Sequence, residues 1–155
     1  MNSNPYFAGK DIYQKFVAVV IVLISCWLVT FPACAQSVPL EVKISLGSGQ
    51  GELKFFPSQL NFIAGQKYKL ILDNPSPTKH YFTAKDFADA SWTQKVEAGK
   101  VEIKGAIHEL ELKPNAQAEW VIVPLKTGKY KLICTIPGHA EAGMVGEIAI
   151  NNPWI

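Results

Sequence analysis

Short stretches in which apolar and polar residues alternate run from Val38 to the C-terminus of the chain. In residues 38–46, 67–72 and 129–134 every second residue is apolar, which is the period of a strand with one buried face. Glycine, proline or asparagine interrupts the alternation about every ten residues, as in proteins built from short strands. We therefore expect about seven or eight strands, the last of them at 145–150.

Residues 84–105 depart from this pattern, because their apolar positions follow no clean period. Residues 85–92 suit one helical turn, and the rest suits an irregular segment. The patterns together predict an all-β fold, which we expect to be an antiparallel Greek-key β-sandwich or barrel with one irregular or short helical excursion at 84–105. Trp92 and Trp120 are expected in its core.

The N-terminal segment has the features of an export signal. Two lysines precede an almost unbroken apolar run from Phe16 to Leu28, and alanines follow at positions 33 and 35, where a cleavage site requires small residues. We predict a signal peptide of residues 1–35, cleaved after Ala35, and a mature domain of residues 36–155.

Two other interpretations of this segment stay open. Retention as a membrane anchor is disfavoured, because the apolar run is shorter than the roughly eighteen residues that typically span a bilayer. Lipidation is the second, since Leu23-Ile24-Ser25-Cys26 resembles a lipobox. The expected location is the periplasm, with the thylakoid lumen, or a membrane-anchored form that faces the periplasm, as alternatives.

The composition suits one ordered domain, because 48% of the 155 residues are hydrophobic and can form a core. The formal net charge is +2, and the fifteen basic residues are all lysines, spread along the chain. Nucleic-acid binding requires a concentrated basic face, so no nucleic-acid partner is expected. Contact with a membrane is expected only through the signal peptide before cleavage.

The chain has three cysteines, and cleavage after Ala35 would remove Cys26 and Cys34. Cys134 would then be the single thiol of the mature domain, which excludes a disulfide within it. A lone exported cysteine is a buried apolar side chain, a partner in an intermolecular bond, or a reactive or metal-bound thiolate.

Cys134, His139 and Met144 recur with four residues between each pair. A thiolate, an imidazole and a weak thioether are donors of a trigonal His2Cys copper centre with a long axial methionine bond. Such a centre needs a second histidine. His80, at the start of the expected strand 79–83, is the candidate, because a Greek-key sandwich can bring that strand start beside the loop between the last two strands.

Simpler interpretations of these residues stay open. His80 alone would be a polar residue at a strand start, and Met144 would be core packing, with the axial position vacant or filled by a backbone oxygen. His108 lies in a strand beside Glu109 and Glu111, and no ligand partner stands at a useful spacing, so no metal role is expected for it.

The segment from Phe56-Pro57 through Asn74, His80 and the Cys134-x4-His139-x4-Met144 loop together resemble the cupredoxins, the small blue-copper electron-transfer family. The spacing of the loop is closer to rusticyanin or auracyanin than to plastocyanin. The resemblance implies one type 1 copper ion, with His80, Cys134 and His139 as equatorial ligands and Met144 as the axial ligand. One position departs from the family, because Tyr81 stands where several members have an Asn or Ser that helps to hold the ligand loop.

The resemblance also implies an electron carrier in which copper cycles between Cu(I) and Cu(II). His139 would present its ring edge to redox partner proteins, such as a cytochrome or an oxidase. A small apolar patch around it, formed by Pro137, Ala140, Ala142 and Gly143, would suit brief docking. A monomer is expected.

Other function classes fit the residues less well. Copper storage, delivery or resistance on the same fold is the alternative, although such sites favour Met-rich surfaces and this chain has only two methionines. Enzyme activity is not expected, because three histidines cannot build a second copper centre beside this one. A cysteine hydrolase would place Cys134 at the start of a helix, and zinc rarely takes a thioether ligand.

Overall fold

The computed structural model describes Gln14, Lys15, Val17 and residues 38–154. Most of the predicted signal peptide, together with its cleavage point after Ala35, lies outside the described residues. Among the described residues, no helix is both long enough and apolar enough to cross a membrane.

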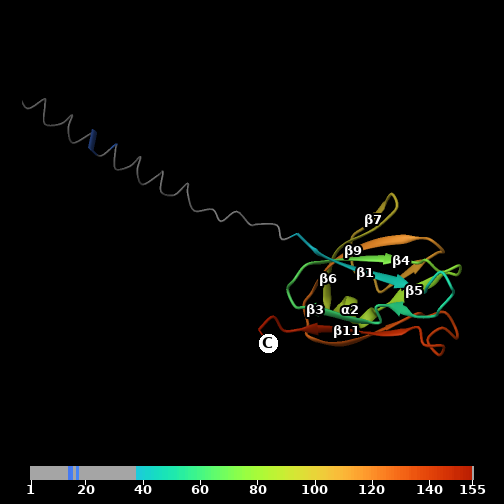
Figure 1. The fold of residues 1–155 in the computed structure, drawn as a ribbon. Coiled ribbons are helices and arrows are strands. Elements are labelled where there is room, and N and C mark those ends of the chain that lie inside the picture. The colour runs from blue at the N-terminus through green and yellow to red at the C-terminus, as the bar shows by residue number, and fades with distance from the viewer. Residues whose placement is uncertain (1–13, 16, 18–37, 155) are drawn as a thin grey trace, which may run out of the picture. The chain divides into compact units, whose positions relative to one another are not determined.

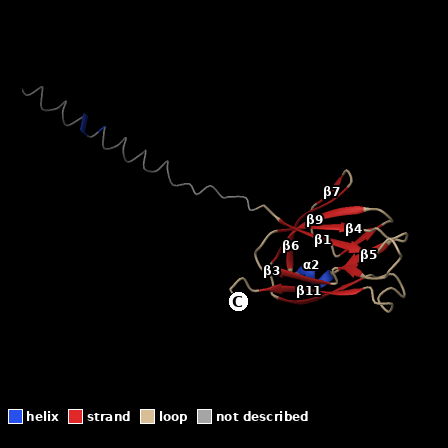
Figure 2. Cartoon of the chain, viewed as in Figure 1, coloured by secondary structure: helices blue, strands red, loops and turns tan. Residues whose placement is uncertain are grey.

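Residues 38–154 form two packed β-sheets and one short helix (Figures 1 and 2). The six strands of the first sheet lie in the order β2 (Phe55–Phe56), β1 (Leu40–Leu46), β4 (Tyr68–Asp73), β9 (Gln117–Pro124), β6 (Ser91–Ala98) and β7 (Val101–Ile103). The five strands of the second sheet lie in the order β3 (Gln59–Ile63), β11 (Val145–Asn151), β10 (Gly128–Ile133), β5 (His80–Thr83) and β8 (Glu109–Leu112). The all-β prediction is confirmed.

The expectation of purely antiparallel sheets is wrong at two pairs of strands. β1 pairs with β4 in parallel, and β11 pairs with β3 in parallel. The chain leaves β1, crosses to the second sheet to form β3, and returns beside β1 in the same direction. Alternation reports only which face of a strand is buried, so it does not reveal the direction of a neighbouring strand.

The predicted helical turn is present as α2 (Lys85–Asp89), but most of the remaining excursion forms the strands β6 and β7. β6 contains a register shift between Thr93 and Lys95, where the strand bulges against β9. A bulge inserts one residue and inverts the alternation, so the sequence of a bulged strand shows no clean period. Residues 38–154 contain eleven strands, more than the seven or eight expected, in part because this excursion adds β6 and β7.

The core lies between the sheets and is rich in aromatic side chains. Trp120 is buried as predicted, and its ring packs edge-on against Phe82 and Phe87, with centroid distances of 6.1 and 6.2 Å. The prediction that Trp92 is in the core is wrong, because its side chain is 55% exposed. Trp92 precedes the bulge and lies opposite Val123 on the outer face of the first sheet.

One end of the sandwich brings together loops that are far apart in the sequence. The loop that joins β10 to β11, orange-red in Figure 1, lies near the turn after β1 and the turn before β5. β5 pairs with β10 through Thr83 and Ile133, so the first residue of β5 and the residue after β10 lie at the same end. The candidate site forms there.

Candidate metal centre

His80 is the first residue of β5, and its side chain is fully buried. Its strand is held by pairing with β8, in which His80 lies opposite Leu112. The preceding turn is organised by the buried side chain of Asn74. Its Nδ2 donates to the carbonyl oxygens of Thr78 and Leu112, both at 2.8 Å, and its Oδ1 accepts from Ser76 N at 3.0 Å. His80 is thus held on both sides.

Cys134 follows β10 directly and is fully buried at the start of the last connecting loop. The loop is closed by its own backbone, because Cys134 N donates to Met144 O at 3.1 Å and Met144 N donates to His139 O at 2.9 Å. A tight turn, in which His139 N donates to Ile136 O at 3.0 Å, directs His139 back toward Cys134. Gly138 has a φ of +87° in this turn, a conformation that favours glycine.

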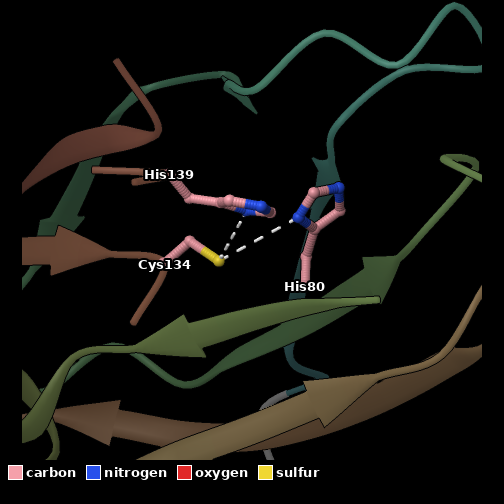
Figure 3. A group of neighbouring side chains, drawn as sticks. All are labelled: His80, Cys134 and His139. Atoms are coloured by element: carbon pink, nitrogen blue, oxygen red, sulfur yellow. Dashed lines mark hydrogen bonds between the residues drawn. The ribbon is translucent and has the colours of Figure 1, made fainter. Parts of the chain in front are cut away.

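The side chains of His80, Cys134 and His139 converge on one point (Figure 3). Each offers one donor atom, and the three atoms lie within 4.8 Å of one another. Cys134 Sγ is 3.5 Å from His139 Nδ1 and 3.9 Å from His80 Nδ1. Both rings therefore present the same nitrogen to the sulfur, and the imidazole planes are tilted by 57° with centroids 5.1 Å apart.

The surroundings of the three donors suit metal binding. Burial lowers the pKa of His80, and the neighbouring His139 lowers it further, which favours the neutral imidazole that a metal requires. The backbone N–H of Tyr81 donates to Cys134 Sγ at 3.4 Å. This hydrogen bond helps to fix the position of the sulfur.

This contact is independent of the departure at Tyr81. A backbone N–H does not depend on the side chain, so Tyr81 supplies one hydrogen bond to the sulfur without an Asn or Ser there. Its phenol O–H points away to the carboxylate of Glu111, which also accepts from Lys79 Nζ at 3.1 Å. The ring is thereby fixed on the outer face of the second sheet.

Met144 lies beside the cluster in the sequence and His108 lies apart from it. Met144 is fully buried, and its backbone is paired with that of Cys134, so it belongs to the same loop closure. His108 lies apart from the cluster, and its Nε2 contacts Asp89 Oδ1 at 2.7 Å. Sequence reasoning did not assign Asn74 its structural role, although an asparagine at the start of a proline-rich turn is a signal for such hydrogen bonding.

The donor set fits copper. A soft thiolate and two imidazole nitrogens in a largely buried site are suited to copper, and the oxygen-rich sites of magnesium or calcium differ from it in every donor. Copper is therefore the cofactor that these residues would hold. The roles of His80, Cys134, His139 and Met144 as individual ligands are proposals that follow below.

The sequence is similar to those of known proteins. Residues 17–146 match the family model "Cupredoxin-like domain". The chain is 32% identical over 120 residues to a chloroplastic plastocyanin of Fritillaria agrestis, across 77% of this chain and 65% of the relative. It is 30% identical over 111 residues to a plastocyanin of Cucurbita pepo, across 71% of this chain and 100% of the relative. The chain spans 61% of the length of a third plastocyanin, from Silene latifolia subsp. alba.

Solved structures share the fold. Auracyanin A, a "blue" copper protein of Chloroflexus aurantiacus, aligns with a TM-score of 0.52 and 24% identity over 74% of this chain and 100% of its own. A Cu-containing nitrite reductase of Thermus scotoductus SA-01 aligns with a TM-score of 0.55 and 16% identity over 72% of this chain and 31% of its own. The fold is therefore found in a copper enzyme as well as in a small copper protein, and function must be argued from the site.

Proposed function

Since this chain belongs to the cupredoxin family, we propose that it carries single electrons between redox partner proteins through one type 1 copper ion. The observation that carries the proposal is the convergence of His80 Nδ1, His139 Nδ1 and Cys134 Sγ within 4.8 Å of one another. These three residues are the proposed equatorial ligands. Met144 is the proposed axial ligand, since it is buried and closes the same loop.

The chain's own residues would make electron transfer fast by holding the donors nearly still. When bound, copper supplies the Cu(I)/Cu(II) redox couple. A small change in geometry between the two charge states requires donors that are fixed by packing and by hydrogen bonds to neighbouring groups. The Cys134–Met144 and Met144–His139 backbone bonds and the Asn74 side-chain bonds supply this support. Full burial of His80 and Cys134 also limits the access of water.

His139 is the proposed route for electrons, because it is the one partly exposed residue of the converging three. The surrounding patch of Pro137, Ala140, Ala142 and Gly143 is exposed or half-exposed. Small apolar side chains carry no polar groups that would have to lose water on docking, which suits brief contact with a redox partner. We also propose that the protein acts as a monomer and docks its partners at this patch.

Copper loading tests the proposed function directly. The protein loaded with Cu(II) should be intensely coloured and should give an EPR spectrum with the small hyperfine splitting of a type 1 site. Cys134→Ala should remove the colour, because the colour arises from the copper–thiolate bond. A colourless protein with an ordinary square-planar Cu(II) signal would refute the proposal, and so would an unchanged spectrum in Cys134→Ala.

Electron carrying can be separated from copper storage or delivery on the same fold. A carrier should show fast, reversible voltammetry and should retain copper against a chelator. Slow, irreversible redox behaviour with ready transfer of copper to the chelator would favour storage or delivery instead.

We further propose that the mature protein starts at Gln36 in an exported compartment. The support is the charged, apolar and small-residue pattern of residues 1–35. Intact-mass analysis of protein from its native cells should give the mass of residues 36–155. A retained N-terminus, or a lipid attached to Cys26, would contradict cleavage after Ala35.

A further inference from the structure

Gly47 lies against the far edge of the His80 ring. It follows β1, and its backbone N donates to Lys54 O at 2.8 Å, which closes the turn that begins there. A Cβ atom at position 47 would lie 2.9 Å from His80 Nε2 and 3.0 Å from Ser76 Cβ. No Cβ is tolerated at such distances without displacement of the neighbouring atoms. Only glycine therefore leaves His80 its present position.

Thr78 contacts the same edge of the ring. Its Oγ1 lies 3.5 Å from His80 Nε2 and 3.2 Å from Ser76 Oγ. His80 Nδ1 faces Cys134 Sγ, so the tautomer that leaves Nδ1 free for a metal carries its proton on Nε2. In that tautomer the Nε2–H can donate to Thr78 Oγ1, and the Thr78 hydroxyl can in turn donate to Ser76 Oγ.

We propose that Gly47 and Thr78 are positioning residues for His80. Gly47 leaves the space that the Nε2 edge occupies, and Thr78 accepts the Nε2–H and so fixes both the tautomer and the rotation of the ring. Strand pairing of β5 fixes the backbone of His80, whereas these two contacts fix the direction in which Nδ1 points. The inference rests on the proposed role of His80 as a copper ligand. Hydrogen bonds of this kind to a ligand histidine orient its ring and strengthen metal binding.

Gly47→Ala and Gly51→Ala form a matched pair for the test. Gly47 has a φ of +80° and Gly51 a φ of +82°, so alanine meets the same backbone strain at both positions. A Cβ at Gly51 meets no heavy atom within 4 Å, whereas one at Gly47 meets the His80 ring. The two variants therefore differ in their contact with His80.

Cu(II) affinity and the EPR hyperfine splitting are the readouts for this pair. Gly51→Ala should match the wild type in both. Gly47→Ala should lower Cu(II) affinity by about 10-fold or more and should change the splitting, because the Nδ1 direction changes. Equal behaviour of the two variants would overturn the role of Gly47.

Thr78→Val and Thr78→Ser test the hydrogen bond, and they carry the test alone if Gly47→Ala does not fold. In the Cu(I)-loaded protein, a diamagnetic form, the His80 Nε2–H should be visible by ¹H–¹⁵N NMR in the wild type. It should exchange with solvent about 10-fold faster or more in Thr78→Val, since the acceptor is lost, and should return to the wild-type rate in Thr78→Ser. An unchanged exchange rate in Thr78→Val would overturn the role of Thr78.

These readouts separate the inference from the proposed function. A wild-type protein that binds copper without a type 1 spectrum would refute the electron-carrier proposal, while the affinity and NMR comparisons would still measure the positioning of His80. A wild-type protein with a type 1 spectrum, together with unaffected Gly47 and Thr78 variants, would refute the inference alone.

Discussion

Asn74→Ala should destabilise the fold strongly, because one buried side chain organises the turn before His80. Asn74 is 1% exposed. Its amide donates to Thr78 O and Leu112 O and accepts from Ser76 N, at 2.8, 2.8 and 3.0 Å. The substitution removes all three bonds and retains the backbone bonds that position 74 makes to Ala116 O and from Asn115 N.

The size of the effect follows from these bonds. A buried polar group left without a partner costs about 1–3 kcal/mol, and a water molecule that enters the vacated space recovers part of that cost. Three such groups give a loss of about 3–5 kcal/mol in the free energy of unfolding. A domain of this size is typically stable by about 5–15 kcal/mol, so the variant should fold with a much smaller margin.

Urea unfolding of the metal-free protein measures this loss, with the same slope m expected for wild type and variant. Asn61→Ala is the matched control, because Asn61 is an exposed asparagine on β3. The control should change stability by less than about 0.5 kcal/mol. A loss of less than about 1 kcal/mol in Asn74→Ala would show that water or a rearranged turn satisfies these groups, and would refute the reasoning.

Two further predictions concern other parts of the fold. In the core, Trp120 Nε1 donates to Thr93 Oγ1 at 3.1 Å. Thr93→Val should lower the free energy of unfolding by about 1–3 kcal/mol, because it leaves the indole N–H without a partner. Thermal unfolding measures this loss, and a Thr93→Ser variant as unstable as Thr93→Val would contradict the account. On the surface, hydrogen bonds from Lys85 and then His108 hold the pKa of Asp89 below its ordinary value. A carboxyl group with a lowered pKa stabilises the fold above its unfolded-state pKa, and this effect is lost as the pH falls through the folded-state pKa. The difference in stability between wild type and Asp89→Asn should therefore shrink toward acid pH. A difference that does not change with pH would contradict this prediction.

Part of the fold was open to prediction because it depends on local pattern. Strands β1, β4 and β10 were predicted since each has one buried face and alternates without interruption. β6 was not, because its bulge at Thr93 and Lys95 breaks the period, and the same bulge accompanies the exposure of Trp92. The parallel β1–β4 and β11–β3 pairs depend on how the chain crosses between sheets, and no local pattern reports that.

The candidate site also has one part that the sequence predicts and another that depends on the fold. The sequence shows the donor types and the short segment that carries Cys134, His139 and Met144, because a single turn between neighbouring strands can bring residues at this spacing together. Tertiary structure decided what reaches that loop from afar. It brought His80 Nδ1 to 3.9 Å from Cys134 Sγ, directed the Tyr81 N–H at the sulfur, and set Gly47 against the ring. These contacts join residues more than thirty positions apart along the chain, and they exist only because the packed sheets bring the loops to one end.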